Sequence, residues 1–485
     1  MMPNRVAVRR AALLAAFYIL LAWLSMRPDH VQDPDLGWHL RAGEWMLDHR
    51  AVPLTDPFSA YGQDRPWVAY SWLFEVFVAG LYRRLGPISV IVYTVAMCMA
   101  NLLALQLLLR RLGAGVQKAV VISGLAAVAL TPLFAPRPWL FTTLFFIVTL
   151  HLLTMVEQTR RVRHLLWIPL VFVAWANIHI QFVYGLALIG MYAVEPLIAT
   201  WLNRSEPVRN VRGELGRRAA LLAACVAATL VNPYGIKVYV PVLEVVQSTT
   251  MFQYITELHA MDFRHPAHWI VLAMILGAAF TLGRERETRP LPWLLLGAGV
   301  FVGFRATRDI WMPVIAAAAI MASVKQENPA DSLRLPAWAV SSVVVVVALM
   351  TLVLAGKQKL APADLEADLA REYPAAAVRF IESHHYAGPL FNHFDWGGFL
   401  MWRFPAVPVS IDGRANLHGD QRIARAVSTW SGAEGWAQDP ELCAARLVIA
   451  QVHLPLATLL RSDPRFDLVY TDDVAAVFVA RTHLH

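Results

Sequence analysis

Charged residues are scarce in this chain of 485 residues: Asp, Glu, Lys and Arg together make up only 16% of it, while 57% is hydrophobic. Soluble domains are about one quarter charged and less than half apolar, so the composition excludes a purely soluble enzyme. With 26 glycines and 3 cysteines, a collagen-like chain and a disulfide-built scaffold are excluded as well. The composition predicts an α-helical polytopic membrane protein.

Several common signatures of soluble catalysis are also missing. The chain contains no Walker loop, no GxGxxG, no HExxH and no GxSxG, which argues against an ATP motor, a dinucleotide enzyme and the common hydrolases. The net charge of +7 could suggest nucleic-acid binding, but the basic residues lie in short loops between apolar runs. That distribution is typical of membrane orientation.

Eleven apolar runs are long enough for a membrane helix, which needs about 20 residues or fewer if its polar ends snorkel. They cover about 11–26, 88–109, 119–133, 139–156, 165–180, 183–201, 219–231, 267–283, 291–304, 309–323 and 336–356. The first run follows three arginines and lacks a small-residue cleavage site, so we interpret it as a retained helix. A cleaved signal peptide is the alternative.

Basic residues predict the orientation of these runs. If the N-terminus is cytoplasmic, the inner segments contain 19 Lys and Arg, among them Arg204, Arg209, Lys325 and Arg334, and the much longer outer segments contain 11. This bias places the N-terminus inside, and an odd number of spans then places the C-terminus outside. The segment 70–82 carries Glu75 and is interpreted as an interfacial helix rather than a span.

The first outer loop, about 27–87, begins with an acidic motif. It reads Asp33-Pro-Asp35, followed by His39 and Arg41. Two carboxylates and an imidazole this close together could bind a divalent ion such as Mg²⁺ or Mn²⁺, with Asp33 and Asp35 as ligands, or accept a proton. The alternative is an ordinary Asp-Pro turn with a helix N-cap.

Further ionisable and polar residues fall on the same predicted outer side. They are Arg137, Asn177, His179, Lys237, Glu257, His259, Arg305 and Arg308, with a second outer loop over 232–266. Ionisable groups near membrane depth are costly and usually face a polar cavity. Cations and anions gathered on one face suit an anionic phosphate together with a metal or base. For each arginine alone, a snorkelling anchor is the alternative. Glu195 lies toward the inner end of its run and is interpreted as structural.

The composition changes after residue 356. Residues 1–356 have a net charge of +10 and residues 357–485 one of −3. Helix patterns over 373–381, 420–430 and 454–461, and strand patterns over 389–392, 407–411, 445–450 and 474–480, predict a small α/β domain over 357–485. Its notable motifs are Asp395-Trp396-Gly-Gly and Asp412-Gly-Arg414, for which turn chemistry is the alternative interpretation.

This layout resembles the GT-C superfamily of membrane glycosyltransferases. Asp33-Pro-Asp35 with His39 is similar to the first-loop acidic motif of oligosaccharyltransferase catalytic subunits. Asp395-Trp396-Gly-Gly, followed by Asp412-Gly-Arg414, is loosely similar to their WWDYG region, although the chain has Phe394-Asp-Trp-Gly-Gly there. The order of elements also resembles a bacterial group of this superfamily, which implies a bacterial inner membrane with the C-terminal domain extracytoplasmic.

The resemblance implies transfer of a sugar from a polyprenyl-phosphate-linked donor to a lipid, glycan or protein acceptor on the outer face. Asp35 or Asp33 would then be the base or metal ligand, and Glu257 and His39 would be further catalytic candidates. Arg308, Arg305, Lys237 and Arg137 would bind the donor phosphate. The residues implied for sugar or acceptor binding are Asn177, His179, His259, Asp395, Trp396, Asp412 and Arg414.

Two other functions fit parts of the pattern. A lipid or glycan transporter would place ionisable residues near the midplane on broken helices, whereas here they gather at one surface. A non-catalytic protein of envelope-polysaccharide assembly could keep the whole layout without the chemistry. Convergence of the outer-face acids and bases would favour the enzyme.

Overall fold

The structure is a computed structural model, and it describes residues 5–63, 65–202, 211–324, 337–355 and 359–481. It contains two compact units. The helical unit comprises Met1–Arg27, Val92–Ile236 and Thr256–Gln358. The mixed unit comprises Pro28–Ile91, Lys237–Ile255 and Lys359–His485. The mixed unit thus combines the predicted C-terminal domain with most of the first outer loop and part of the second.

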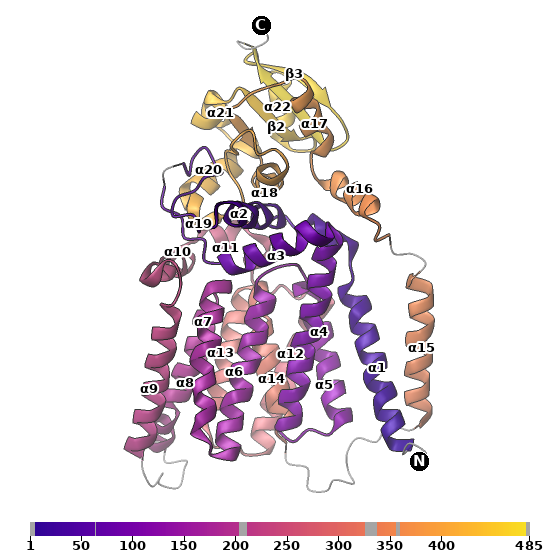
Figure 1. Cartoon of the computed structure of the whole chain (residues 1–485), viewed down its shortest axis with the longest axis vertical. Coiled ribbons are helices and arrows are strands. Elements are labelled where there is room, and N and C mark those ends of the chain that lie inside the picture. The colour runs from indigo at the N-terminus through magenta and orange to yellow at the C-terminus, as the bar shows by residue number, and fades with distance from the viewer. Residues whose placement is uncertain (1–4, 64, 203–210, 325–336, 356–358, 482–485) are drawn as a thin grey trace. The chain divides into compact units, whose positions relative to one another are not determined.

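Each of the eleven apolar runs forms a helix, shown in Figure 1. Their bounds are α1 Arg5–Ser25, α4 Ile88–Arg111, α5 Val116–Ala129, α6 Trp139–Thr159, α7 Trp167–Ile178, α8 Phe182–Trp201, α9 Val211–Thr229, α12 Pro266–Arg284, α13 Pro290–Arg305, α14 Trp311–Ala322 and α15 Ala337–Ala355. Within the described residues, four of these helices, α4, α6, α8 and α12, are at least 18 residues long and apolar enough to cross a membrane. The protein is an integral membrane protein, and the count of eleven spans stays a prediction.

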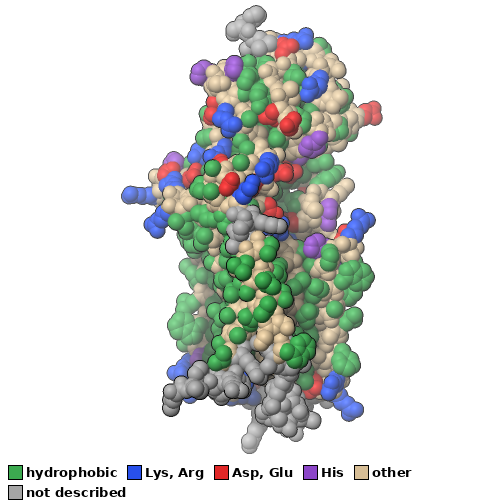
Figure 2. Space-filling model, turned by 90° about the vertical axis from the view of Figure 1, so that its right-hand side faces the viewer, with side chains coloured by type: hydrophobic (Ala, Val, Ile, Leu, Met, Phe, Trp, Pro, Cys, Tyr) green, Lys and Arg blue, Asp and Glu red, His purple; other side chains and the backbone are tan. Residues whose placement is uncertain are grey.

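The helical unit is organised around α14, which is buried along nearly its whole length. It contacts α5, α12 and α13. Glycines allow the close approach of α13: a Cβ built on Gly299 would lie 2.9 Å from the backbone of Pro313. Figure 2 shows hydrophobic side chains over the flank of the helical unit on the side of α1 and α15, with Lys and Arg at the lower end. This is the surface expected of helices that face lipid.

Short helices connect the long ones in this unit. They are η2 Thr131–Leu133, η3 Val162–Leu166, η5 Thr256–Leu258 and η6 Thr307–Asp309. Proline opens α12 and α13, where its missing N–H and fixed φ suit the first helical turn. Arg204, Arg209, Lys325 and Arg334 of the predicted inner segments lie outside the described residues, as does the predicted domain boundary after residue 356.

The mixed unit contains a four-stranded sheet with the order β1-β2-β4-β3. β1 (Leu390–Asn392) pairs in parallel with β2 (Leu447–Gln451), while β4 (Ala475–Ala480) pairs antiparallel with β2 and with β3 (Phe466–Thr471). In register, Ile449 of β2 lies opposite Val477 of β4. β2 and β4 are almost continuously apolar and buried, as central strands covered on both faces must be.

The remaining elements of the mixed unit are helices. They are η1 Pro28–Gln32, α2 Leu36–His49, α3 Trp72–Leu85, η4 Gly235–Tyr239 (which begins in the helical unit), α10 Val240–Gln247, α11 Thr250–Tyr254, α16 Pro362–Glu372, α17 Ala375–Ser383, α18 Phe394–Arg403, α19 Ala415–His418, α20 Asp420–Trp430, η8 Trp436–Gln438, α21 Pro440–Ala444 and α22 Pro455–Leu460. α17 packs on β3 and β4, and α22 on β2. The predicted helix in the segment 70–82 is present as α3.

One strand prediction was wrong. Residues 407–411 do not join the sheet, and only Val409 makes an isolated parallel bridge, to Ser59 of the first loop. The strand β3 was not predicted, because Phe466–Thr471 mixes apolar and polar residues on a partly exposed edge. The predicted helices over 373–381, 420–430 and 454–461 are confirmed as α17, α20 and α22.

Candidate functional site

The acidic motif of the first loop forms the entrance to α2. Asp33 accepts a hydrogen bond from the backbone N–H of Asp35 through its Oδ1 (3.0 Å), which is the Asx turn expected of such a sequence. Asp35 occupies the N-cap position of α2 but makes no side-chain capping hydrogen bond. The Asp33 side chain therefore forms the turn that the alternative interpretation expected. The Asp35 side chain does not cap the helix, so capping does not explain its carboxylate.

Glycines bring the first-loop motif against the two motifs of the C-terminal region within the mixed unit. A Cβ built on Gly37 would lie 2.3 Å from the carbonyl oxygen of Gly398, and one on Gly398 would lie 2.7 Å from that of Pro34. At Gly413, a Cβ would lie 2.1 Å from Oδ1 of Asp35. Any side chain at these three positions would displace backbone or the Asp35 carboxylate. Segments more than 350 residues apart in the sequence therefore form one surface around Asp35.

Asp412 and Arg414 lie at the centre of a buried ion network. Arg414 Nη2 is 2.7 Å from Asp412 Oδ2, and Arg414 Nη1 is 2.6 Å from Asp56 Oδ1. His418 Nε2 lies 3.2 Å from Asp412 Oδ2. Burial alone would raise the pKa of Asp412, but the charges of Arg414 and His418 bring this pKa well below its usual range. The network leaves both predicted sugar-binding side chains enclosed, and Asp56 is a member that the sequence did not single out.

His39 is inside the mixed unit rather than on its surface. Its Nδ1 lies 3.5 Å from Oε1 of Glu75, and both side chains are at most 3% exposed. Trp38 packs beside the imidazole and Phe74 packs edge-on against it. Burial lowers the pKa of His39 and raises the pKa of Glu75 to about 8, against the opposing charge of Arg414. At neutral pH the pair is therefore largely uncharged.

Asp395 and Trp396 open α18 and point to different environments. The Asp395 side chain is 62% exposed, with His393 Nδ1 at 3.8 Å from its Oδ2. Trp396 is buried, and its indole N–H donates to the backbone oxygen of Glu372 (3.0 Å). Asp395 is thus accessible to a ligand, whereas Trp396 packs in the interior. Lys237, in η4, is exposed and also belongs to the mixed unit.

In the helical unit, Glu257 lies between two guanidinium groups. Arg308 Nη1 is 3.4 Å from Glu257 Oε1, and Arg137 Nη2 is 3.9 Å from Glu257 Oε2. Both separations are longer than the 2.7–2.9 Å of a tight charge-assisted hydrogen bond. Arg137 is buried and its guanidinium lies over the Trp139 ring. We call Arg137, Glu257 and Arg308 the arginine–glutamate cluster.

A buried carboxylate lies next to Arg308 in the chain. Asp309 is 4% exposed, its Oδ1 accepts from Gln181 Nε2 (2.7 Å) and its Oδ2 from the hydroxyl of Tyr184 (2.5 Å). These bonds fix η6 to the start of α8. Gln181 and Tyr184 were not identified from the sequence, because nothing in their spacing connects them to a loop more than 120 residues away.

The predicted polar residues of the fifth run also lie at helix ends of this unit. His179 Nδ1 is 2.9 Å from Thr142 Oγ1, which also accepts from the Trp175 indole. Asn177 donates to the backbone oxygens of Val173 and Val231. Both side chains are less than 8% exposed. They join α6, α7 and the segment that follows α9 rather than lining an open surface.

The last two predicted residues, His259 and Arg305, lie close in sequence to Glu257 and Arg308 respectively. The backbone oxygen of His259 accepts from Thr307 N (2.9 Å) and Thr307 Oγ1 (3.0 Å), while the His259 ring is exposed. Arg305 is an exposed residue at the end of α13. These backbone bonds hold Glu257 and Arg308 in range of each other.

The structure adds no further metal ligands to Asp33 and Asp35, the two residues predicted to bind a divalent cation, among the residues that it describes. No group of three or more His, Cys, Asp or Glu side chains suited to a metal occurs among the described residues. Asp33 and Asp35 supply two carboxylates, one of them engaged by a backbone N–H, whereas Mg²⁺ and Ca²⁺ take six or more oxygen ligands. Within the part of the chain that the structure describes, these two carboxylates do not make a metal site by themselves.

Comparison with solved structures identifies the fold. The oligosaccharyltransferase of Archaeoglobus fulgidus in the apo form is similar, with a TM-score of 0.54 and 10% identity over 91% of this chain and 69% of that one. The A. fulgidus oligosaccharyltransferase AglB, in complex with an inhibitory peptide and a dolichol-phosphate, gives 0.53 and 11% over the same shares. The chain has the GT-C fold.

A third structure is similar over almost its full length. ArnT of Cupriavidus metallidurans, bound to undecaprenyl phosphate, has a TM-score of 0.50 and 15% identity over 98% of this chain and 97% of that one. No protein-family model and no curated protein matches the sequence. The GT-C resemblance that the sequence motifs suggested is confirmed at the level of the fold.

Proposed function

We propose that this protein is an integral-membrane glycosyltransferase that takes a sugar from a polyprenyl-phosphate-linked donor on the extracytoplasmic face of a bacterial inner membrane. The observation that carries this is the arginine–glutamate cluster at the ends of apolar helices in a GT-C fold. Arg137 and Arg308 hold Glu257 only at 3.9 and 3.4 Å. A donor phosphate could contact both guanidinium groups at the shorter distances of a charge-assisted hydrogen bond.

The likeness to AglB and ArnT supports the choice of donor. Those proteins were solved with a dolichol-phosphate and with undecaprenyl phosphate, and both ligands are polyprenyl phosphates. The predicted orientation, with a cytoplasmic N-terminus, places the cluster and the mixed unit outside. An alkaline phosphatase fusion after residue 481 tests this: we expect it to be active, and an inactive, stable fusion would contradict the proposed sidedness.

In the proposed reaction, a hydroxyl or amide of the acceptor attacks the anomeric carbon of the donor sugar. The new bond forms as the bond between that carbon and the phosphate oxygen breaks, and the electron pair leaves with the polyprenyl phosphate. Arg308, Arg137 and Arg305 would stabilise this developing negative charge, with Lys237 as a further candidate. Asp35, with Asp33 as the alternative, would receive the proton of the acceptor.

Other predicted residues take supporting roles. Asp412 and Arg414 would position the loop beneath Asp35, since Gly413 touches its carboxylate, and His39 would support α2 from within. Asn177 and His179 would fix the helix ends near the donor. Asp395, which is exposed, is the candidate for acceptor contact, together with His259.

The test is transfer by the purified protein from a panel of polyprenyl-phosphate sugars, measured as released polyprenyl phosphate. We expect turnover with at least one donor and a loss of 10²-fold or more in Asp35→Asn. Asp48→Asn is the matched control, because Asp48 lies on the same helix α2, 56% exposed and paired with Arg83, and should retain full activity.

Two results would reject the proposal. Full turnover in Asp35→Asn with an identified donor would remove the assigned base. Binding of donors without release of carrier phosphate under any condition would favour a transporter or a non-catalytic assembly protein.

A further inference from the structure

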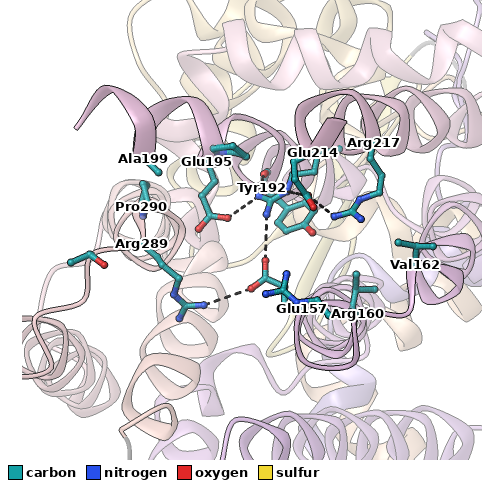
Figure 3. Close-up of a pocket in the computed structure, with 14 residues that line it drawn as sticks. Glu157, Arg160, Val162, Tyr192, Glu195, Ala199, Glu214, Arg217, Arg289 and Pro290 are labelled. Carbon is teal, nitrogen blue, oxygen red and sulfur yellow. Dashed lines mark hydrogen bonds and ion pairs between the residues drawn. The ribbon is translucent and has the colours of Figure 1, made fainter. Parts of the chain in front are cut away.

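A cavity of about 400 Å³ opens in the helical unit at the helix ends opposite to the arginine–glutamate cluster. It is formed by the end of α6, the second half of α8, the start of α9 and the residues before α13, and Figure 3 shows its lining. Its volume is within the range of small-molecule sites. No role assigned above uses this cavity.

The position of the cavity relative to the membrane can be inferred from α6, which has the arginine–glutamate cluster near its start and the cavity near its end. α6 runs from Trp139, beside Arg137, to Thr159 at the cavity, and 21 helical residues span about 31 Å, close to the thickness of the hydrocarbon core. Trp201 and Trp293, at the end of α8 and the start of α13, are 81% and 42% exposed. Exposed tryptophans at helix ends mark the level of lipid headgroups.

One guanidinium in the cavity, that of Arg218, is held by contacts with the surrounding protein. Arg218 Nη1 lies 2.8 Å from Glu195 Oε2 and donates to the backbone oxygen of Tyr192, while its guanidinium carbon is 3.9 Å from the centre of the Tyr192 ring. This arrangement ties α9 to α8. Arg218 therefore builds the wall of the cavity rather than offering a site for a ligand.

Two other arginines line the cavity and are more exposed than Arg218. Arg160 lines the cavity and is exposed, and it has no ion pair with any carboxylate among the residues that the structure describes. Its φ of 57° lies in the left-handed region, where glycine is the usual residue at a helix end. Arg217, one helical position before Arg218, is paired with Glu214 and 36% exposed.

One carboxylate is held only loosely. Glu157 lies 3.6 Å from Arg218 and 3.6 Å from Arg289, and within the described part of the chain it accepts no hydrogen bond. Glu157 and Arg160 are one helical turn apart and face the same hollow in Figure 3. The cavity thus presents a loosely paired carboxylate one helical turn from an exposed guanidinium, with apolar Val156, Val162 and Ala199 completing the wall.

We propose that this cavity binds the headgroup of a zwitterionic phospholipid of the phosphatidylethanolamine type. The phosphate contacts Arg160 and Arg217, and the ammonium group contacts Glu157. A purely anionic headgroup would offer no cationic group to Glu157. A soluble zwitterion would not use the apolar wall of the cavity, nor its position at the level of the lipid headgroups. This lipid site is separate from the proposed donor site, since it occupies the other ends of α6, α8 and α13.

Native mass spectrometry of the delipidated full-length protein in detergent tests the proposal, with phosphatidylethanolamine, phosphatidylglycerol and free phosphoethanolamine added separately. We expect phosphatidylethanolamine to bind at least tenfold more tightly than the other two. Equal binding of phosphatidylglycerol would overturn the assigned ammonium contact, and equal binding of phosphoethanolamine would overturn the lipid as the source.

Two variants localise the binding. Arg160→Gln removes no ion pair, so it should fold normally and weaken phosphatidylethanolamine binding at least tenfold, and Glu157→Gln should do the same. Arg161→Gln is the matched control, because Arg161 is the next residue, exposed and outside the lining. Unchanged lipid binding in Arg160→Gln, or an equal loss in Arg161→Gln, would overturn the site. The measurement needs no donor sugar, so its failure is distinguishable from failure of the proposed transferase activity.

Discussion

Arg414 of the mixed unit and Arg308 of the helical unit are both guanidinium groups beside a carboxylate, but they are built differently. Arg414 is 1% exposed in its side chain and lies 2.6–2.7 Å from two aspartates. Arg308 is 20% exposed and lies 3.4 Å from one glutamate. The buried arginine has its hydrogen-bonding groups matched within the fold, whereas the more exposed one is the residue that we propose to contact the donor phosphate.

The difference has an energetic reason. A buried ion is stable only when its partners satisfy it, so removal of one partner costs several kcal/mol. A half-exposed pair at longer separation contributes little to stability, about 0–1 kcal/mol. We therefore expect substitutions of Arg414 to damage the fold and substitutions of Arg308 to damage activity.

The largest effect is expected for Arg414→Met. It leaves Asp56 and Asp412 buried without their cation, which should lower the free energy of unfolding by about 3–5 kcal/mol. Thermal unfolding of the full-length protein in detergent measures this loss. Arg465→Gln is the control, since Arg465 is 37% exposed and pairs with nearby Asp463, and should change stability by less than about 1 kcal/mol. If Arg414→Met were as stable as the native chain, the proposed difference between a structural Arg414 and a ligand-binding Arg308 would be wrong.

The next effect concerns activity. Arg308→Gln should lower the turnover number of sugar transfer about 10²-fold, or about 2.7 kcal/mol in the activation barrier, with stability changed by less than about 1 kcal/mol. Released carrier phosphate and thermal unfolding are measured on the same preparation. Arg264→Gln, at a 91% exposed position in the segment between η5 and α12, should keep normal turnover. An equal loss of turnover in both variants would argue against a specific phosphate contact.

A smaller effect is expected where the first-loop motif meets α18. Gly37→Ala forces a methyl group against the backbone of Gly398 and should destabilise the protein by about 1–3 kcal/mol. Gly80→Ala, in α3, meets nothing within 4 Å, so it should be neutral or stabilising by up to about 1 kcal/mol. Thermal unfolding compares the two, and equal effects would show that the glycine contact around Asp35 is not tight.

The smallest effect is the pH dependence contributed by Glu75. Burial raises its pKa to about 8, so the folded state keeps a proton that the unfolded state releases, and stability falls as pH rises toward 8. The lowered pKa of His39 makes stability rise with pH instead, but only at pH values below the ordinary pKa of histidine. Between pH 6.5 and 8 we expect a loss of about 1 kcal/mol per pH unit. Denaturant unfolding should show this slope in the native chain and a flatter one in Glu75→Gln; parallel curves would contradict it.

Much of the architecture could be predicted from the residues. The eleven apolar runs all form helices, of 12–24 residues, because an apolar segment can satisfy its backbone only internally in lipid. The segment 70–82 carries Glu75 and forms α3 in the mixed unit. Strand prediction was weaker. Residues 407–411 are apolar because they pack in the interior, and this composition alone does not show that they stay out of the sheet. Their single bridge, from Val409 to Ser59, depends on a loop 350 residues earlier in the chain.

The candidate site was predictable by residue type and not by environment. The sequence identified Arg414 and Arg308 equally well as site residues, because neither a motif nor a position in a loop predicts how far a side chain will be buried. It also missed Gln181 and Tyr184, which bond Asp309, and the Glu157–Arg160 pair of the cavity.

By itself, the order of residues determined where the chain is apolar, where basic residues orient it, and which polar groups stand out from that background. Only the tertiary structure decided which of those groups are enclosed and which can accept a ligand. The physical reason is that hydropathy and charge are properties of local segments, whereas the desolvation and pairing of an ion depend on the atoms that folding brings around it from distant parts of the chain.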